Sequence, residues 1–317
     1  MNRYFEKNVG LLYAMLKRCE LCPRKCRIDR TAGETGFCGL PADIVMDCCL
    51  AHHGEEPPLS GTRGAGTIFL SSCNLKCIYC QNYQISHKVQ GEQLTAAGLA
   101  RIMLDLQDRG CHNVEPVTPT PQTPGTMEAL LMARKDGLTV PFVYNCSGYE
   151  NPDVVELLDG MVDIYLPDFK YGQNEDGRMF SGVEDYVENC VASIREMVRQ
   201  VGDEGRLIMD GNGIAEKGVI IRHLVLPGRM ENSFGVLDLM KKHISLQASV
   251  GIMSQYTPIP ALRTHPLLGR RVTRREYESV VNYALDMGFE NLFIQDVDDR
   301  SFSPDFERDT PFNFESG

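Results

Sequence analysis

Residues 65–82 read AGTIFLSSCNLKCIYCQN, an apolar strand-like run that passes directly into a loop with three cysteines. The spacing of Cys73, Cys77 and Cys80 is Cys-x3-Cys-x2-Cys, with Tyr79 just before the last cysteine. Three thiolates at this spacing fit three corners of a 4Fe–4S cluster, because cysteine thiolates are the usual ligands of such clusters. No fourth cysteine follows nearby, so one iron would stay open to a small molecule. The pattern therefore predicts a catalyst rather than an electron carrier.

Strand and helix patterns alternate through most of the chain after this loop. Strands are expected at residues 65–71, 113–118, 140–146, 161–170, 219–226, 246–253 and 292–295, and helices at 95–109, 124–135, 154–158, 183–201, 232–243 and 273–287. This alternation predicts an α/β fold whose parallel sheet curves into a partial (β/α)6 TIM-like barrel. We place the barrel at residues 59–295, between a cysteine-rich, metal-binding N-terminal extension at 1–58 and an acidic C-terminal tail at 296–317.

Polar or sulfur-bearing residues stand at the C-terminal ends of five expected strands. They are Cys73, Thr118, Asn145, Asp168 and Ser254. In parallel barrels the C-terminal ends of the strands carry the chemistry. We therefore expect these five residues to face one site.

The three-cysteine loop after the first strand, with Tyr79, resembles that of the radical S-adenosylmethionine (SAM) superfamily. Further stretches resemble the homologues of pyruvate formate-lyase activating enzyme: GEEP at 54–57, CQNY at 80–83, YNCSGY at 144–149, LPDFKY at 166–171 and RHLVLPG at 222–228. The resemblance implies a 4Fe–4S cluster whose open iron chelates SAM. One-electron reduction would release a 5′-deoxyadenosyl radical that takes a hydrogen atom from the substrate.

The resemblance also implies a substrate and a partner. An activating-enzyme homologue would take hydrogen from a protein or peptide, as glycyl-radical activases do, and would receive electrons from a low-potential donor such as flavodoxin or ferredoxin. Two other functions fit the cysteines. One is modification of a small molecule or a ribosomal peptide with an auxiliary cluster, and the other is non-enzymatic electron transfer.

Several polar residues are candidates for binding SAM. Asp168 and Lys170 lie two residues apart at a strand end, so both face the same side and suit the two charged ends of methionine, as a similar Asp-x-Lys pair does in the activating-enzyme relatives. The alternative is a surface ion pair that caps the strand. Arg222 either contacts a carboxylate of the cofactor or is a buried arginine paired with a neighbouring strand. Thr118 and Asn145 either line the pocket, with Tyr79 beside them, or cap helices.

Two further stretches have no assigned role in this scheme. Residues 117–124 read VTPTPQTP, and their three prolines stiffen the loop where many radical SAM proteins carry a Gly-Gly-Glu-like stretch. His52 and His53 precede two glutamates, which suits a proton relay or a metal ligand. We interpret both histidines instead as polar contacts in a connecting loop.

A second cysteine set consists of Cys19, Cys22, Cys26 and Cys38. Glycines at 33, 36 and 39 permit the tight turns that would bring these four thiolates together. The set can hold a structural zinc ion or an auxiliary 4Fe–4S cluster. Zinc knuckles more often contain two Cys-x2-Cys pairs, and this set has one, so the spacing favours iron–sulfur.

Composition limits the compartment and the partners. Twelve cysteines, with neither a signal-peptide pattern nor an apolar run long enough for a membrane span, favour metal binding in the cytoplasm over disulfides, and Cys190 suits an apolar core position. The net charge of −11 argues against binding nucleic acid or anionic membranes. Residues 17–30 are locally basic, which indicates a solvated patch or a docking surface for an acidic electron donor.

Overall fold

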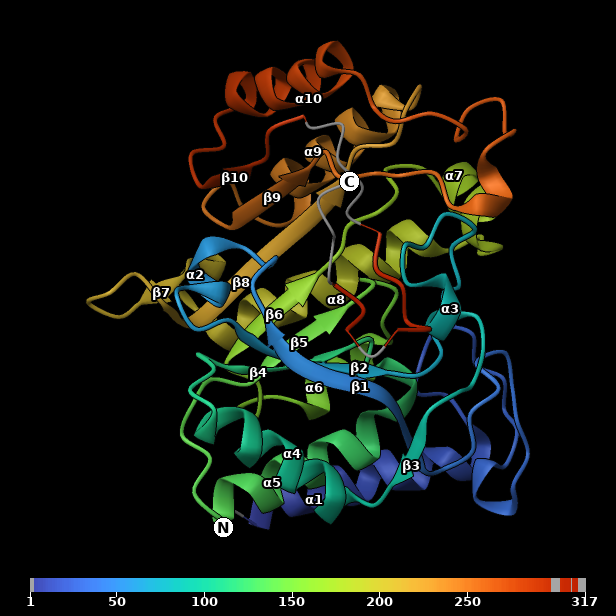
Figure 1. The fold of residues 1–317 in the computed structure, drawn as a ribbon, viewed down its shortest axis with the longest axis vertical. Coiled ribbons are helices and arrows are strands. Elements are labelled where there is room, and N and C mark those ends of the chain that lie inside the picture. The colour runs from blue at the N-terminus through green and yellow to red at the C-terminus, as the bar shows by residue number, and fades with distance from the viewer. Residues whose placement is uncertain (1–2, 298–302, 309, 313–317) are drawn as a thin grey trace.

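The computed structural model describes residues 3–297, 303–308 and 310–312, and a single open sheet forms its centre (Figure 1). In the described part of the chain the sheet has ten strands in the order β10-β9-β8-β6-β5-β4-β2-β1-β3, with β7 paired to β8. The strands are β1 (Ile44–His52), β2 (Ala65–Leu70), β3 (Glu92–Leu94), β4 (Val114–Val117), β5 (Val143–Cys146), β6 (Ile164–Pro167), β7 (Ile208–Met209), β8 (Ala215–Leu224), β9 (Ser249–Met253) and β10 (Leu292–Ile294).

Strands β2, β4, β5, β6, β8, β9 and β10 pair with one another in the parallel sense. Strands β1, β3 and β7 pair in the antiparallel sense. The sheet does not close on itself, since β10 and β3 stand at its two edges. This arrangement confirms the predicted α/β fold with a partial barrel. Because all parallel strands point the same way, their C-terminal ends lie along one rim.

Helices follow most of the parallel strands. In chain order the α-helices are α1 (Arg3–Ala14), α2 (Pro57–Ser60), α3 (Tyr83–Ser86), α4 (Ala96–Asp108), α5 (Thr123–Lys135), α6 (Pro152–Leu157), α7 (Asn174–Ser181), α8 (Tyr186–Val201), α9 (Met230–His243) and α10 (Arg274–Met287), of which α1 and α2 precede the first parallel strand. Figure 1 shows α1, α4 and α5 together below the sheet and α9 with α10 at the opposite end. The expected capping box opens α10, because Thr273 and Glu276 bond to each other's backbone N–H groups.

Two N-terminal elements were not predicted from the sequence pattern. Helix α1 contributes Val9 and Leu12 to the main core, and β1 pairs along β2. The apolar alternation of β1 is interrupted at Asp47, where the register shifts between Met46 and Cys48, so the period of a strand is hidden in the sequence. Residues 3–52 thus share the sheet and the core of the barrel, and a boundary at residue 58 stays a prediction.

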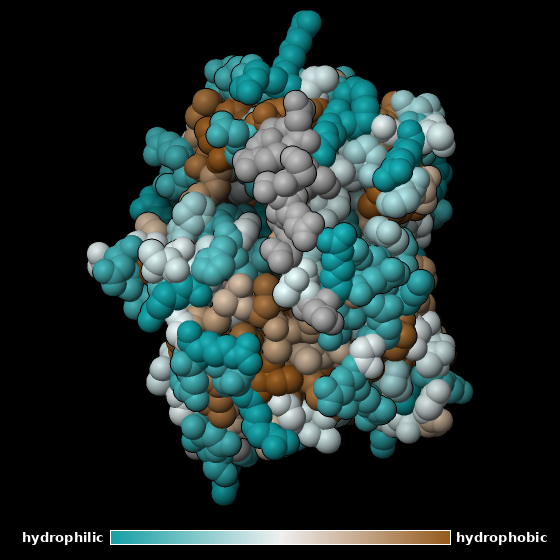
Figure 2. All heavy atoms as spheres, in the orientation of Figure 1, coloured by the Kyte–Doolittle hydropathy of each residue, from teal (hydrophilic) through white to brown (hydrophobic). Residues whose placement is uncertain are grey.

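Figure 2 shows brown side chains near the middle of the face that it draws. A small buried apolar cluster at β2 consists of Phe69, Ile85 and Phe306. Phe306 and Phe312 both approach Phe69, with ring centroids 5.2 Å apart in each pair. These two aromatic residues lie in the predicted acidic tail, of which residues 298–302, 309 and 313–317 lie outside the described residues. Elsewhere Cys190 is fully buried on α8, as expected. Among the described residues, no helix has the length and apolar character of a membrane span.

Candidate functional site

The three-cysteine loop follows β2 and carries backbone strain at two positions. Ser72 and Lys76 adopt left-handed conformations with φ of 67° and 49°, which cost energy for residues other than glycine. Cys73 and Cys77 are 8% and 6% exposed. The Leu75 N–H donates to Cys73 Sγ at 3.3 Å, and burial raises the pKa of the Cys73 thiol to about 12. The loop therefore presents buried sulfurs in a fixed geometry.

One cavity of about 150 Å³ collects the predicted cluster and cofactor residues. Its lining includes Cys73, Cys77, Cys80, Tyr79, Thr118, Asn145, Ser147, Asp168, Lys170 and Arg222. Four of the five strand-end residues thus face one site, as expected. The prediction is wrong for Ser254, whose hydroxyl donates instead to the Asp296 carbonyl at 2.8 Å. Strand β9 ends at Met253 as expected, but Met253 and Gln255 line the cavity in place of Ser254.

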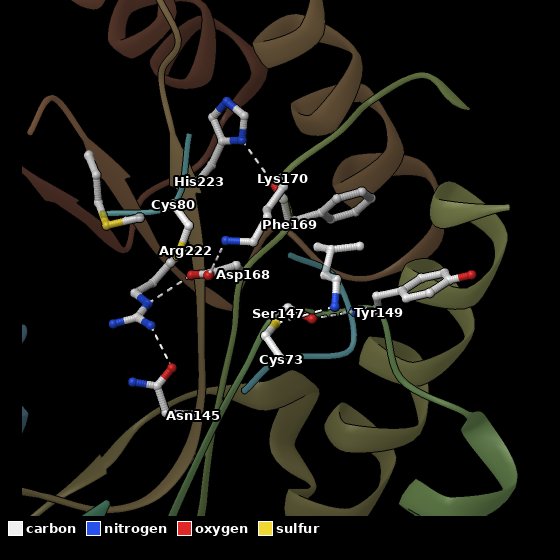
Figure 3. A network of polar contacts seen from close by, with 12 residues as sticks. Cys73, Cys80, Asn145, Ser147, Tyr149, Asp168, Phe169, Lys170, Arg222 and His223 are labelled. Atoms are coloured by element: carbon white, nitrogen blue, oxygen red, sulfur yellow. Dashed lines mark hydrogen bonds and ion pairs between the residues drawn. The ribbon is translucent and has the colours of Figure 1, made fainter. Parts of the chain in front are cut away.

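Asp168 is the centre of a buried polar network (Figure 3). Lys170 Nζ lies 2.6 Å from Asp168 Oδ2, and Arg222 Nε lies 3.1 Å from Asp168 Oδ1. The Arg222 guanidinium also bonds Glu55 at 2.9 Å and Asn145 Oδ1 at 2.7 Å. Burial would raise the pKa of Asp168, but the cations of Lys170 and Arg222 together hold it below its ordinary value.

This network shows where two of the residues with alternative roles lie. The Asp168–Lys170 pair is not a surface cap, because these side chains are 17% and 18% exposed. Arg222 is a buried arginine paired with neighbouring strand ends, since it also forms a parallel bridge with Asp168. Neither placement conflicts with a role toward a bound cofactor, because both residues line the cavity.

The buried carboxylate of Glu115 was missed by sequence reasoning. Asn145 Nδ2 donates to Glu115 Oε1 at 2.6 Å, and burial raises the pKa of Glu115 well above its ordinary value. Glu56 behaves similarly, with burial raising its pKa to about 7. Within the described residues one oxygen of Glu56 and one of Glu115 have no hydrogen-bond partner. The sequence feature that could have revealed Glu115 is its place as the single charged residue in the otherwise apolar strand β4.

Glu150→Gln is expected to remove a pH dependence from the stability of the chain. Glu150 is 1% exposed, and burial raises its pKa to about 7 from the ordinary 4.5. Between these values the folded chain keeps a proton that the unfolded chain has released, so stability falls as pH rises. Relative to the Gln variant, the free energy of unfolding of the parent chain should fall by about 1.4 kcal/mol per pH unit in this window and then level off. Urea unfolding of both chains across the window measures this, and a constant difference would contradict it.

The proline-rich loop has a structural role through Gln122. Its side-chain oxygen accepts from the Val45 N–H at 2.6 Å, and its nitrogen donates to the Val45 and Ser71 carbonyls at 3.1 and 2.9 Å. The loop therefore ties β1 to the end of β2. Thr118, at the start of the loop, has φ of 56° and faces the cavity.

A second cavity of about 330 Å³ adjoins the first, and its lining includes His52, Glu55 and Glu56. The two cavities share Gln81, Arg222, Met253 and Gln255. His52 Nε2 lies 4.0 Å from Glu55, while His53 is exposed. The histidine pair is thus split between a cavity wall and the surface.

The basic stretch at 17–30 is less solvated than expected. Arg30 is 2% exposed and donates to the Pro121 carbonyl at 2.7 Å, while half-buried Arg24 bonds four main-chain carbonyls. The expectation of a wholly solvated patch is therefore wrong for these two arginines. Lys17, Arg18, Lys25 and Arg27 remain exposed.

Known proteins resemble this chain in sequence. A family model described as the radical SAM superfamily matches residues 67–209, which include the three-cysteine loop, Asp168 and Lys170, whereas Glu55 and Arg222 lie outside the match. An uncharacterized protein of Methanocaldococcus jannaschii is 30% identical over 280 residues, which are 85% of this chain and 75% of that protein.

Two solved structures resemble its fold. Methylornithine synthase (PylB) aligns with a TM-score of 0.50 at 15% identity, over 72% of this chain and 63% of that one. SuiB of Streptococcus suis, bound to S-adenosylmethionine, aligns with a TM-score of 0.47 at 16% identity, over 73% of this chain and 47% of that one. The chain thus spans less than two thirds of either structure, and the first likeness is one of fold alone.

Proposed function

Because the chain belongs to the radical SAM superfamily, we propose that Cys73, Cys77 and Cys80 hold a 4Fe–4S cluster and that the adjoining strand ends hold SAM. The observation that carries the proposal is the single cavity shared by three buried cysteines and the polar strand ends. Thiolate sulfurs suit iron, and a cluster with three protein ligands keeps one iron open. When bound, the two groups supply a radical that removes hydrogen from a substrate.

The protein's own residues position and shield the reacting groups. The Lys170 ammonium interacts with the thiolates of Cys77 and Cys80, so it offsets negative charge beside the cluster. Asp168 offers its carboxylate to the amino end of SAM, and Arg222 keeps that carboxylate ionised. The cavity is walled by Tyr79, which is 5% exposed and packs against other aromatic rings. This burial keeps water away from a reactive radical.

We further propose that the substrate is a protein or peptide segment, with a glycine residue of a partner enzyme as the model case. The second cavity lies beside the first and is lined by the side-chain amides of Gln81, Gln255 and Gln295. An amide both donates and accepts, so three of them suit the N–H and C=O groups of a peptide backbone. The likeness of GEEP, YNCSGY and LPDFKY to the activating-enzyme homologues points the same way. A low-potential flavodoxin or ferredoxin would supply the electron.

The test has two stages under anaerobic conditions. The reconstituted chain is first incubated with SAM and dithionite, and we expect 5′-deoxyadenosine by chromatography. If no 5′-deoxyadenosine forms although the cluster is intact, the chain would be an electron carrier rather than an enzyme. The chain is then mixed with a candidate glycyl-radical enzyme, and a glycine-centred signal in electron paramagnetic resonance is expected. Cleavage of SAM without that signal for any candidate would favour a small-molecule or ribosomal-peptide substrate instead.

Lys170→Met is expected to weaken SAM binding at least about tenfold, which corresponds to about 1.4 kcal/mol. The ammonium lies 2.6 Å from Asp168 inside the cavity, and the loss of one member of a buried charge pair leaves the other poorly compensated. Equilibrium dialysis with SAM measures the affinity, and the iron content checks that the cluster is retained. Lys241→Met, at an exposed lysine on α9, is the matched control. Unchanged affinity with full iron content would remove Lys170 from the SAM site.

A further inference from the structure

The second cysteine set is built around one small cavity of its own. All four sulfur-bearing residues line it, together with Arg24, Arg30 and Asn74. The turn from Cys19 to Ile28 is closed by two backbone bonds, Cys19 N–H to the Ile28 carbonyl at 2.8 Å and Arg27 N–H to the Cys19 carbonyl at 2.9 Å. Four cysteines spread over residues 19–38 thus line one cavity of the fold.

Three of these sulfurs receive main-chain N–H groups. Phe37 N–H donates to Cys26 Sγ at 3.4 Å, Arg24 N–H bonds Cys22, and Leu40 N–H bonds Cys38. The backbone at Gly36 also comes close, since a Cβ there would stand 2.7 Å from Cys26 Sγ. Hydrogen bonds to sulfur are a main means by which proteins stabilise metal-bound thiolates.

Positive charge is provided where four thiolates would need it. Arg30 is buried and interacts with Cys38, and its own hydrogen bonds go to the carbonyls of Pro41 and Pro121. The strain of the first loop is repeated here, because Lys25 and Arg27 have φ of 41° and 57°. Strained, cation-lined cysteine turns occur at both sites, which indicates a shared type of ligand.

Geometry separates an iron–sulfur cluster from a zinc ion. Four sulfurs at about 2.3 Å from one tetrahedral zinc lie about 3.8 Å from each other. Among the described residues, no group of three or more histidine, cysteine or acidic side chains is placed to hold a metal ion directly, and this is true of both cysteine sets. A cluster holds its thiolates farther apart, because the iron atoms lie between them. We propose that Cys19, Cys22, Cys26 and Cys38 hold a second iron–sulfur cluster.

This second cluster lies against the loop of the first. The Arg24 guanidinium donates to the Asn74 carbonyl at 3.0 Å and to the Leu75 carbonyl at 3.4 Å. Asn74 follows Cys73 directly and lines the second set's cavity. The same guanidinium bonds the Ser181 carbonyl at 2.8 Å. One arginine thus joins the two cysteine loops and the end of α7.

The test is an iron and sulfide count on four anaerobically reconstituted chains. The parent chain is expected to hold about eight irons, and the triple variant Cys73→Ala/Cys77→Ala/Cys80→Ala about four. The double variant Cys22→Ala/Cys26→Ala should also hold about four, while the matched control Cys48→Ala/Cys49→Ala keeps about eight. Cys48 and Cys49 are half-buried like Cys22 and Cys26 but belong to neither set.

The outcomes separate this inference from the proposed function. A parent chain with about four irons, which the double variant keeps and the triple variant loses, overturns the second cluster. A triple variant without iron overturns it too. The double variant tests the other site, because SAM cleavage by this variant would show that the first cluster acts on its own. If the parent chain cleaves no SAM but holds the expected iron, the proposed function fails while the second cluster stands.

Discussion

Cys77→Ala is expected to lose the reductive cleavage of SAM by at least about a thousandfold, which corresponds to about 4 kcal/mol of activation free energy. Cys77 is 6% exposed and lines the same cavity as Lys170. Alanine removes one of three thiolates, and two remaining ligands hold a cluster poorly. The measurement is 5′-deoxyadenosine formed per chain with SAM and dithionite, together with the visible absorbance of the cluster.

A buried cysteine outside the site provides the control for this variant. Cys111 is 2% exposed and lines neither cysteine cavity, so Cys111→Ala removes a sulfur of similar burial. We expect this control to keep cleavage within a few fold of the parent chain. If Cys77→Ala formed 5′-deoxyadenosine at the parent rate, the three-cysteine loop would not hold the catalytic cluster.

Arg222→Met is expected to lower the free energy of unfolding by about 3–5 kcal/mol. Its guanidinium pairs with Asp168 and Glu55 and donates to Asn145, and its side chain is 13% exposed. Methionine fills a similar volume but leaves two buried carboxylates without their shared cation. Urea unfolding of the metal-free chain should show a lower midpoint with an unchanged slope.

An exposed arginine with the same kind of partners calibrates this loss. Arg199 pairs with Asp159 at 2.8 Å and Glu196 at 2.6 Å, but its side chain is 55% exposed. Because water screens such pairs, Arg199→Met should cost only about 0–1 kcal/mol. Equal losses for the two variants would mean that burial of the Asp168 network does not strengthen it.

The three-cysteine site proposed to hold a cluster could be located from the sequence because its elements are local. Cys73, Cys77 and Cys80 lie within eight residues, and the strand before them is marked by its apolar run. Thr118, Asn145 and Asp168 were located by counting strands, since parallel strands present their C-terminal ends on one rim. The failure at Ser254 shows the limit of that argument, because β9 ends at Met253 as expected and the Ser254 hydroxyl still donates to the sequence-distant Asp296 carbonyl.

The partners of the charged residues could not be predicted in the same way. Arg222 and Glu55 are 167 residues apart in the chain and meet at 2.9 Å. Glu115 and Asn145 are 30 residues apart, and no local pattern says that β4 and β5 face each other with these side chains. Helix α1 and strand β1 were hidden for a related reason, since their burial depends on α5 and β2 rather than on their own periodicity.

The sequence by itself determined the ligand types, their spacing and the alternation of strand and helix, because these depend on residues close along the chain. Only the tertiary structure decided that Asp168 is shared by Lys170 and Arg222, that Arg24 links two cysteine loops, and that a second cavity adjoins the first. Such contacts join segments far apart in sequence, and they form only when the sheet brings the strand ends together. Three cysteines within one short loop therefore predict a cluster, whereas the charges around it depend on the whole fold.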